Sequence, residues 1–180
     1  NNESFLTRAF IGRSTTADSS RHWRVGYRAD FAVAAGMDNH FILQQLYAEV
    51  QWKALQLSVG QKERTLTLLN DSLSSGAMTT GINTRPLPQV RLELPDFWTV
   101  PGTHRWLALK AHFAMGAYTD NGWQRSSTKT HSLPYTNNSL YHSKELLLRI
   151  GNRERFPLTL TGGLEMSTQF GGEGWNMGQR

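Results

Sequence analysis

The sequence predicts an all-β fold: an antiparallel transmembrane β-barrel of the bacterial outer membrane, to which this chain contributes about eight strands. Apolar and polar residues alternate along most of the chain, as they do in a strand with two different faces. The clearest runs, at residues 24–33, 106–118 and 158–170, exceed the roughly five or six residues of soluble strands. They match the roughly 9–11 residues that a membrane strand needs. No stretch reaches the roughly 18 apolar residues of a transmembrane helix.

Composition agrees with a wall between lipid and water. Hydrophobic residues make up 38% of the chain and charged residues 18%, and both shares are low for a soluble protein. The aromatic share of 11% argues against disorder. The negative mean hydropathy does not exclude a barrel, because lipid-facing and lumen-facing residues average out. The absence of cysteine fits either a reducing cytosol or an exported bacterial protein.

Each strong run separates into an apolar and a polar face. In the first run the apolar face holds Val25, Tyr27, Ala29, Phe31 and Val33. The opposite face carries Arg24, Arg28 and Asp30. In the second run the polar face holds Lys110 and His112, and in the third it holds Glu165 and Gln169. We expect these seven polar side chains to face the barrel lumen.

Weaker strands are predicted at residues 4–11, 41–52, 55–60, 89–94 and 140–151. A change of phase predicts a tight hairpin at Lys53-Ala54. The connections then alternate between short or intermediate (95–104, 152–155) and long (61–88, 119–139). Since outer loops of bacterial barrels are the long ones, residues 61–88 and 119–139 are expected outside the cell. Upstream of residue 41 the pattern leaves the direction open.

The sequence contains no metal-binding, phosphate-binding or dinucleotide motif, and its six histidines lack ligand spacing. We therefore expect no metal, no cofactor, no catalytic residues and no enzymatic activity. The net charge of +5 is scattered, which argues against a nucleic-acid partner. The polar-face carboxylates allow two interpretations, a glycosidase pair or ion pairs in a polar lumen, and we favour the second. These carboxylates are Asp30, Glu49, Glu93 and Glu165, and their expected ion-pair partners are Arg24, Arg28, Arg91, Lys53 and Lys110.

Aromatic residues also allow two interpretations. Five lie near predicted strand ends, as in the aromatic girdles of membrane barrels, and sugar stacking is the alternative: Trp23, Trp52, Trp106, Tyr118 and Tyr141. Trp123, Arg125 and Tyr135 lie in the long loop 119–139. They are our candidates for binding polysaccharide, because they combine stacking surfaces with a fixed fork of donors. The alternative is that the long loops only fold inward and seal the barrel.

Several stretches, taken in order, resemble the Wzi-type capsule assembly proteins of Bacteroidetes-like bacteria. They are Tyr47-Ala-Glu-Val-Gln-Trp52, Leu57-Ser-Val-Gly-Gln-Lys-Glu63, Leu73-Ser-Ser-Gly76, Asn83-Thr-Arg-Pro-Leu-Pro-Gln-Val90, Leu140-Tyr-His-Ser-Lys144, Gly151-Asn-Arg-Glu-Arg-Phe-Pro157, Gly163-Leu-Glu-Met166 and Gln169-Phe-Gly-Gly172. No single motif is specific for this family. The ordered set, which covers residues 41–175, is fairly specific.

The resemblance implies an outer-membrane barrel of about eighteen strands that contacts outer-membrane lipid. It implies a lectin-like protein that attaches or organises capsular polysaccharide at the cell surface and is not an enzyme. Members of the family are more than twice as long, so residues 1–180 are expected to form a single partial barrel domain, with the N- and C-terminal parts of the barrel missing. The alternatives are a general porin or solute channel, and a soluble β-sandwich enzyme or carbohydrate-binding module.

Overall fold

The computed structural model describes residues 5–18, 22–35, 40–64, 85–120, 122–128, 133–152 and 154–175. The chain forms two compact units, Asn1–Lys53 with Leu57–Leu87 and Ala54–Gln56 with Pro88–Arg180. Eight long strands form antiparallel sheet, which confirms the all-β prediction. Within the described residues, no helix combines the length and the apolar character needed to cross a membrane.

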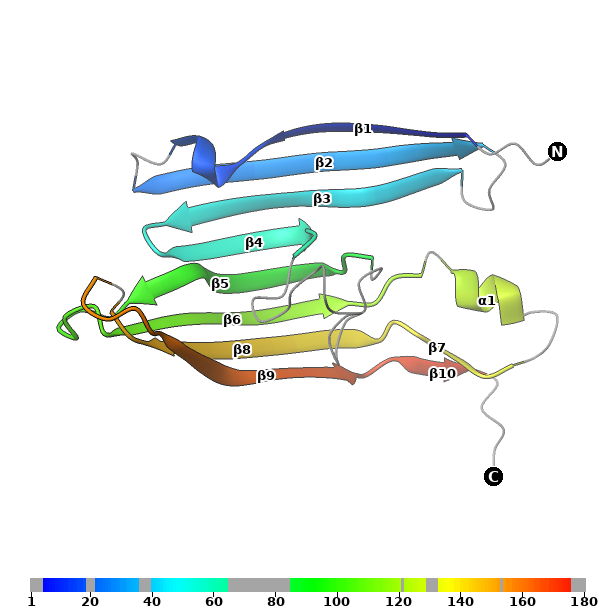
Figure 1. The fold of residues 1–180 in the computed structure, drawn as a ribbon. Helices are drawn as coiled ribbons and strands as arrows, with labels where there is room; N and C mark the ends of the chain where they lie inside the picture. The colour runs from blue at the N-terminus through cyan, green and yellow to red at the C-terminus, as the bar shows by residue number, and fades with distance from the viewer. Residues whose placement is uncertain are drawn as a thin grey trace, which may run out of the picture. The chain divides into compact units, whose positions relative to one another are not determined.

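The first unit contains the strands β1 (Phe5–Arg13), β2 (Trp23–Ala35), β3 (Phe41–Trp52) and most of β4 (Leu55–Gln61), in that order. Consecutive strands are antiparallel neighbours (Figure 1). A 3-10 turn, η1 (Thr15–Asp18), joins β1 to β2 and contacts β2 and β3. The hairpin predicted at Lys53-Ala54 is confirmed. There Lys53 adopts a φ of 52°, and its N–H donates to the His22 carbonyl at 3.0 Å.

A bulge in β3 keeps one face of the first unit apolar. Asp30 pairs with Gln45 and Phe31 pairs with Leu43, which leaves Gln44 as the extra residue. Without this residue, the odd-numbered apolar positions before the bulge and the even-numbered ones after it would point to opposite faces. The apolar face of β3 after the bulge, which holds Leu46, Ala48, Val50 and Trp52, is exposed or half-buried.

The second unit contains β5 (Pro88–Thr99), β6 (Leu107–Ala117), β8 (Leu140–Ile150) and β9 (Leu160–Phe170), in that order in the sheet (Figure 1). The prediction that β5 ends at Leu94 was wrong. Pairing with β6 resumes at Trp98, so that Pro95-Asp96-Phe97 forms a bulge opposite Lys110. Proline lacks an N–H and is tolerated in a strand at such a bulge, where no ladder bond is lost.

Loop 119–139 is more ordered than the sequence indicates. It contains a short helix, α1 (Trp123–Thr128), and a strand, β7 (Tyr135–Asn137). Strand β7 pairs with β10 (Glu173–Trp175), a short strand that the sequence pattern did not predict. Asn138, Gly171 and Gly172 adopt positive φ where β7–β10 follows the β8–β9 ladder. The two strand pairs therefore form one long, interrupted hairpin.

Burial in both units is the reverse of that in a soluble sheet. Among the described residues, the buried hydrophobic side chains are Ala32, Ala34, Ala114 and Leu147. The buried polar side chains include Asp30, Glu49, Glu93, His112 and Glu145. Large apolar side chains instead lie exposed on the faces predicted to be apolar, with Leu164 at 74% and Leu160 at 70%. Contiguous apolar surface of this kind needs an apolar partner, because water disfavours it.

We expect that Leu164→Arg will lower the free energy of unfolding in lipid vesicles by about 2–4 kcal/mol, so that the variant is less stable. Leu164 lies near the middle of β9 on its apolar face, where a guanidinium would replace an exposed apolar side chain. Ser167→Arg, on the opposite face of the same strand, is the matched control and should cost much less. The measurement is the urea dependence of folding in phospholipid vesicles. An equal loss of stability in both variants would contradict a wall with two different faces.

Candidate functional site

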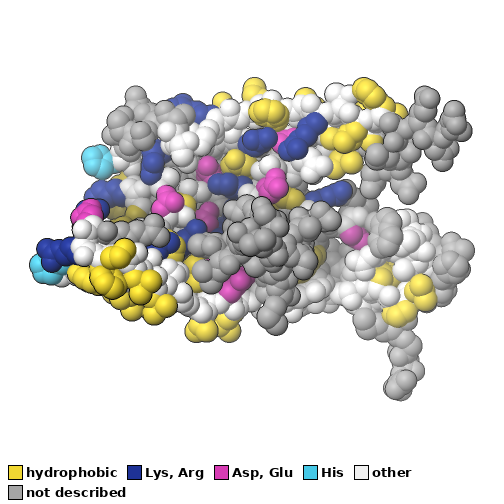
Figure 2. Space-filling view, in the orientation of Figure 1, with side chains coloured by type: hydrophobic (Ala, Val, Ile, Leu, Met, Phe, Trp, Pro, Cys, Tyr) yellow, Lys and Arg dark blue, Asp and Glu magenta, His cyan; other side chains and the backbone are white. Residues whose placement is uncertain are grey.

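The charged side chains of the sheet gather on its polar face. Figure 2 shows basic and acidic side chains interspersed on the side turned to the viewer. The best defined group, on the first unit, is built around Asp30, which is completely buried. Arg8 donates two hydrogen bonds to its carboxylate, from Nε to Oδ1 at 2.8 Å and from Nη2 to Oδ2 at 2.7 Å. Arg28 donates to Oδ2 from Nη2 at 2.9 Å and from Nε at 3.2 Å.

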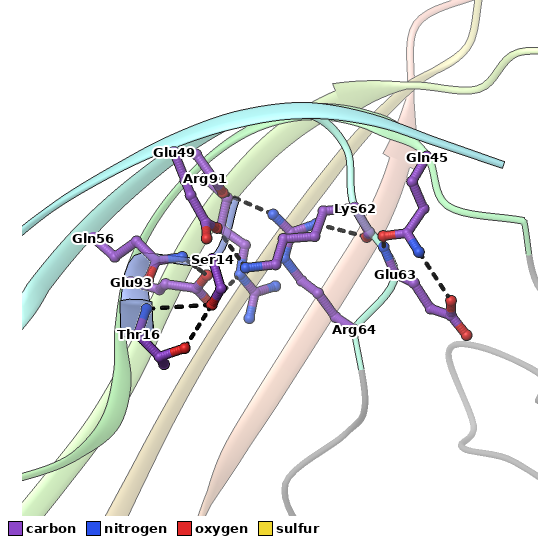
Figure 3. Close-up of polar contacts among 11 residues, drawn as sticks. Ser14, Thr16, Gln45, Glu49, Gln56, Lys62, Glu63, Arg64, Arg91 and Glu93 are labelled. Atoms are coloured by element: carbon purple, nitrogen blue, oxygen red, sulfur yellow. Dashed lines mark hydrogen bonds and ion pairs between the residues drawn. The ribbon is translucent and has the colours of Figure 1, made fainter. Parts of the chain in front are cut away.

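The chain that leaves β4 folds back over the polar face of the first unit. Lys62 pairs with the buried carboxylate of Glu49, and its Nζ lies 5.2 Å from the centre of the Tyr47 ring. Glu63 accepts a bond from the Gln45 amide at 3.3 Å and donates its backbone N–H to Gln45 Oε1 at 3.2 Å. In Figure 3, Lys62 points toward Glu49, whereas Glu63 points toward Gln45 on the other side. Residues 62–64 are thus held against β3 and β4.

Arg64 also holds residues 62–64 against the strands. Its Nη2 donates to the hydroxyl of buried Ser58 at 2.7 Å, and its Nη1 donates to the carbonyl of Lys62 at 2.9 Å. The rest of the predicted long loop, residues 65–84, lies outside the described residues. The described start of the loop, residues 62–64, therefore lies on the polar face of the first unit.

On the second unit, His112 lies between a hydroxyl and a carboxylate. Its Nε2 is 3.1 Å from Ser143 Oγ, and its Nδ1 is 3.7 Å from Glu145 Oε1. A serine hydrolase also needs backbone N–H donors that point at the developing oxyanion. Ser143 lies within β8, which is hydrogen-bonded to β6 on one side and β9 on the other, so its neighbouring amides are used by the sheet. We therefore interpret this trio as a buried polar network and derive no catalytic step from it.

The other predicted lumen residues lie apart from these groups. Arg24 donates to the Lys53 carbonyl at 3.3 Å beside the hairpin. Lys110 is half-buried opposite Leu147, and Glu165 lies directly across from Glu145. Gln169 is exposed opposite Tyr141. All four belong to the polar face as predicted, but β9 exposes both its faces, so Glu165 and Gln169 are not enclosed.

The carboxylates chosen from the sequence are mostly ion-paired. Asp30 binds Arg28 as predicted, and Glu93 binds Arg91 with 2.7 Å between Oε2 and Nε. Two partners were missed, namely Arg8 for Asp30 and Lys62 for Glu49. Arg8 was not predicted as a partner because β1 carries apolar residues on both faces, so its alternation of apolar and polar residues is weak. Lys62 was not predicted as a partner because it follows the end of β4, where strand periodicity no longer indicates which face a side chain occupies.

The predicted polysaccharide residues occupy the end of the second unit formed by α1, β7 and β10. Trp123 is the first residue of α1, and its side chain lies outside the described structure. Arg125 is exposed on the same helix, which contacts β7. Tyr135 is half-buried and pairs with Trp175 of β10, which is 50% exposed. Directly opposed residues share a face of the ladder, so Tyr135 and Trp175 lie on the same face. Trp175 was missed because β10 was not predicted.

Asp120 fixes the start of α1. Its carboxylate accepts the backbone N–H of Gln124 through Oδ2 and that of Gly122 through Oδ1, both at 2.9 Å. These bonds, that from Gln124 above all, lower the pKa of Asp120 below its ordinary value of 3.8. The ionised carboxylate therefore stabilises this end of the hairpin.

The five aromatic residues predicted near strand ends are found there. Trp23 begins β2 and Trp52 ends β3, and their ring centres are 6.1 Å apart. Tyr118 follows the last residue of β6 and meets Tyr141 of β8 edge-on, with 5.8 Å between ring centres. Trp106 directly precedes β6.

Within the described residues, no group of three or more His, Asp or Glu side chains is placed to hold a metal ion. Comparison of the chain with protein-family models, with curated proteins and with solved structures found no match. The proposed function therefore rests on the geometry of the site.

We expect that Asp30→Asn will lower the free energy of unfolding in lipid by about 1.5–3 kcal/mol, because it weakens bonds between a buried charge and two guanidiniums. The matched control is Glu154→Gln, which disrupts an ion pair with Arg105 whose side chains are both about two-thirds exposed. This variant should lose less than about 1 kcal/mol. Equal losses in the two denaturation curves would mean that the Asp30 cluster contributes no special stability.

The lowered pKa of Asp120 predicts a pH dependence at the end of the hairpin. A depressed pKa in the folded state gives stability that is complete above the ordinary value of 3.8 and is lost as the pH falls through the folded pKa. The amide resonances of Gly122 and Gln124 should therefore shift with a midpoint below 3.8. The variant Asp120→Asn should abolish this step. A midpoint above 3.8 would contradict the hydrogen bonding described.

Proposed function

We propose that this chain forms part of the wall of an outer-membrane β-barrel that binds capsular polysaccharide and supports capsule assembly at the bacterial surface. The observation that carries the membrane part is the reversed burial of the sheet. Its large apolar side chains are exposed, while Asp30, Glu49 and His112 are buried on the other face. Outer-membrane barrels have an apolar outside and a polar inside, so a lipid exterior gives this pattern a physical cause.

The aromatic residues support the same proposal. Trp23, Trp52, Trp106 and Tyr118 are each at least 40% exposed and lie at the ends of strands. Indole and phenol rings favour the boundary between lipid and water, because one part of the ring is apolar and the other forms hydrogen bonds. Their positions fit two interfacial girdles with an apolar band between them.

Polysaccharide binding is proposed for the end of the second unit that carries α1, β7 and β10. Arg125 offers a fixed fork of donors, and Tyr135 with Trp175 offers an aromatic surface. Sugars have apolar faces that stack on aromatic rings and hydroxyl groups that accept from guanidinium donors. The resemblance to the Wzi-type family supports a capsular polysaccharide as the ligand.

Residues 62–64 fold back over part of the polar face, which favours a partly occluded lumen over an open channel. They place Lys62, Glu63 and Arg64 on the polar face, each held by hydrogen bonds or an ion pair to a strand residue. We therefore favour the lectin-like barrel over the alternative of a general porin.

We expect that replacing Arg125, Tyr135 and Trp175 together by Ala will leave membrane insertion intact, because none of them belongs to the eight long strands. Cells that carry this variant should release capsule into the medium, and the purified protein should lose glycan binding. The matched control replaces Arg105 and Phe156 by Ala. This pair removes an exposed arginine and an exposed aromatic ring at the opposite end of the β6 and β8 strands.

Capsule shedding and glycan-array binding are the two measurements. Normal capsule retention and unchanged glycan binding in the triple variant would remove these residues from the site. Stable single-channel conductance of the purified wild-type protein in planar bilayers would instead support the porin alternative.

A further inference from the structure

The Arg8–Asp30–Arg28 cluster shares its face with an aromatic ring. In the register of β1 and β2, Phe10 pairs with Asp30, Arg8 pairs with Ala32 and Gly12 pairs with Arg28. Opposed residues point to the same side, so Arg8, Phe10, Arg28 and Asp30 all lie on the polar face. The guanidinium carbon of Arg28 lies 4.5 Å from the centre of the Phe10 ring, which agrees with this placement.

The cluster carries an excess positive charge. Two guanidiniums share the single carboxylate of Asp30, so their charges sum to one net positive charge. Among the described residues near the cluster, Glu49 and Glu63 are equalled in number by Lys62 and Arg64, so one net positive charge remains even though the charge of Glu63 also acts on Arg8.

The excess charge is also accessible. Asp30 is fully buried, but the Arg8 side chain is 50% exposed and that of Arg28 is 31% exposed. Both arginines bind Asp30 through Nε and Nη2, and these bonds do not use either Nη1 group. Because Asp30 already holds both side chains in place, a second anion would meet donors whose conformational entropy is largely lost beforehand.

The ring beside these donors distinguishes a sugar from a simple anion. Phe10 is 66% exposed even though Arg28 lies over it. An exposed aromatic ring next to guanidinium donors suits a ligand that has an apolar ring face and an attached oxyanion. A hexuronic acid unit of a polysaccharide has both features.

We infer that the Arg8–Phe10–Arg28 surface binds carboxylate-bearing sugar units, so that the polysaccharide recognised by this protein is an acidic one. This inference rests on the proposed polysaccharide function and adds the ligand class and a second contact surface, on the polar face of the first unit.

The test compares two probes on the protein in detergent micelles by calorimetry. One is a hexasaccharide of alternating glucuronic acid and N-acetylglucosamine, and the other is the same hexasaccharide with its carboxyl groups reduced to alcohols. The wild-type protein should bind the acidic probe at least about tenfold more tightly, because a charge-assisted bidentate contact is lost on reduction. Arg8→Gln should remove most of this preference, and Arg105→Gln, which removes an exposed arginine elsewhere, should preserve it.

The wild-type protein provides a readout that does not depend on how a variant folds. Raising the salt concentration should weaken binding of the acidic probe and leave binding of the reduced probe nearly unchanged. Equal binding of both probes, or a preference that Arg8→Gln leaves intact, would overturn the inference while leaving polysaccharide binding in place. Failure to bind either probe would overturn it as well. The capsule-retention experiment above tests the proposed function separately.

Discussion

The arrangement of the polar face depends on one constraint: a charged group that leaves water must meet a partner of opposite charge or a hydrogen-bond donor. The Asp30 carboxylate is fully buried and is held by four N–H bonds from two arginines. An isolated carboxylate in that position would be strongly disfavoured. Alternation along the strands makes such pairing possible, because it brings side chains from neighbouring strands to the same face at a spacing of about 5 Å.

The same constraint explains why the two faces of the sheet differ. The backbone groups of the strands are used by the ladders, so only side chains decide what each face contacts. On one face, ion pairs and amide bonds compensate the loss of water. On the other face, exposed Leu, Val and Phe side chains have no such compensation in water. A hydrocarbon surrounding removes the conflict, and this is the physical basis of the proposed membrane location.

The regular part of the fold could be predicted from the sequence. The 41–52 strand has the observed bounds, and the 24–33 strand was short by one residue at its start and two at its end. In both strands apolar and polar residues alternate with at most one change of phase, and this alternation indicates which face each residue occupies. Strand β5 was predicted to end too early because Pro95 is a strong breaker signal, and a bulge that accommodates it depends on the partner strand.

The candidate site was predicted less completely, for two reasons. Arg28 and Asp30 were identified as polar-face residues, but their partner Arg8 lies in β1, where Phe10 and Ile11 give both faces an apolar residue. Pairing across strands depends on register, which the sequence leaves open at that point. Likewise, Tyr135 was chosen for its loop position, whereas its opposition to Trp175 follows from a pairing of residues far apart in the chain.

The bulge at Pro95 has a consequence for how the strands assemble. A regular ladder lets one strand slide along its neighbour by two residues and recover most of its bonds. Pro95 has no N–H to offer, so a slide that carried it into the regular ladder would leave a carbonyl of a neighbouring strand without its donor. In a low-dielectric surrounding such a carbonyl is costly. Pro95 therefore favours the observed alignment, in which the bulge lies opposite Lys110.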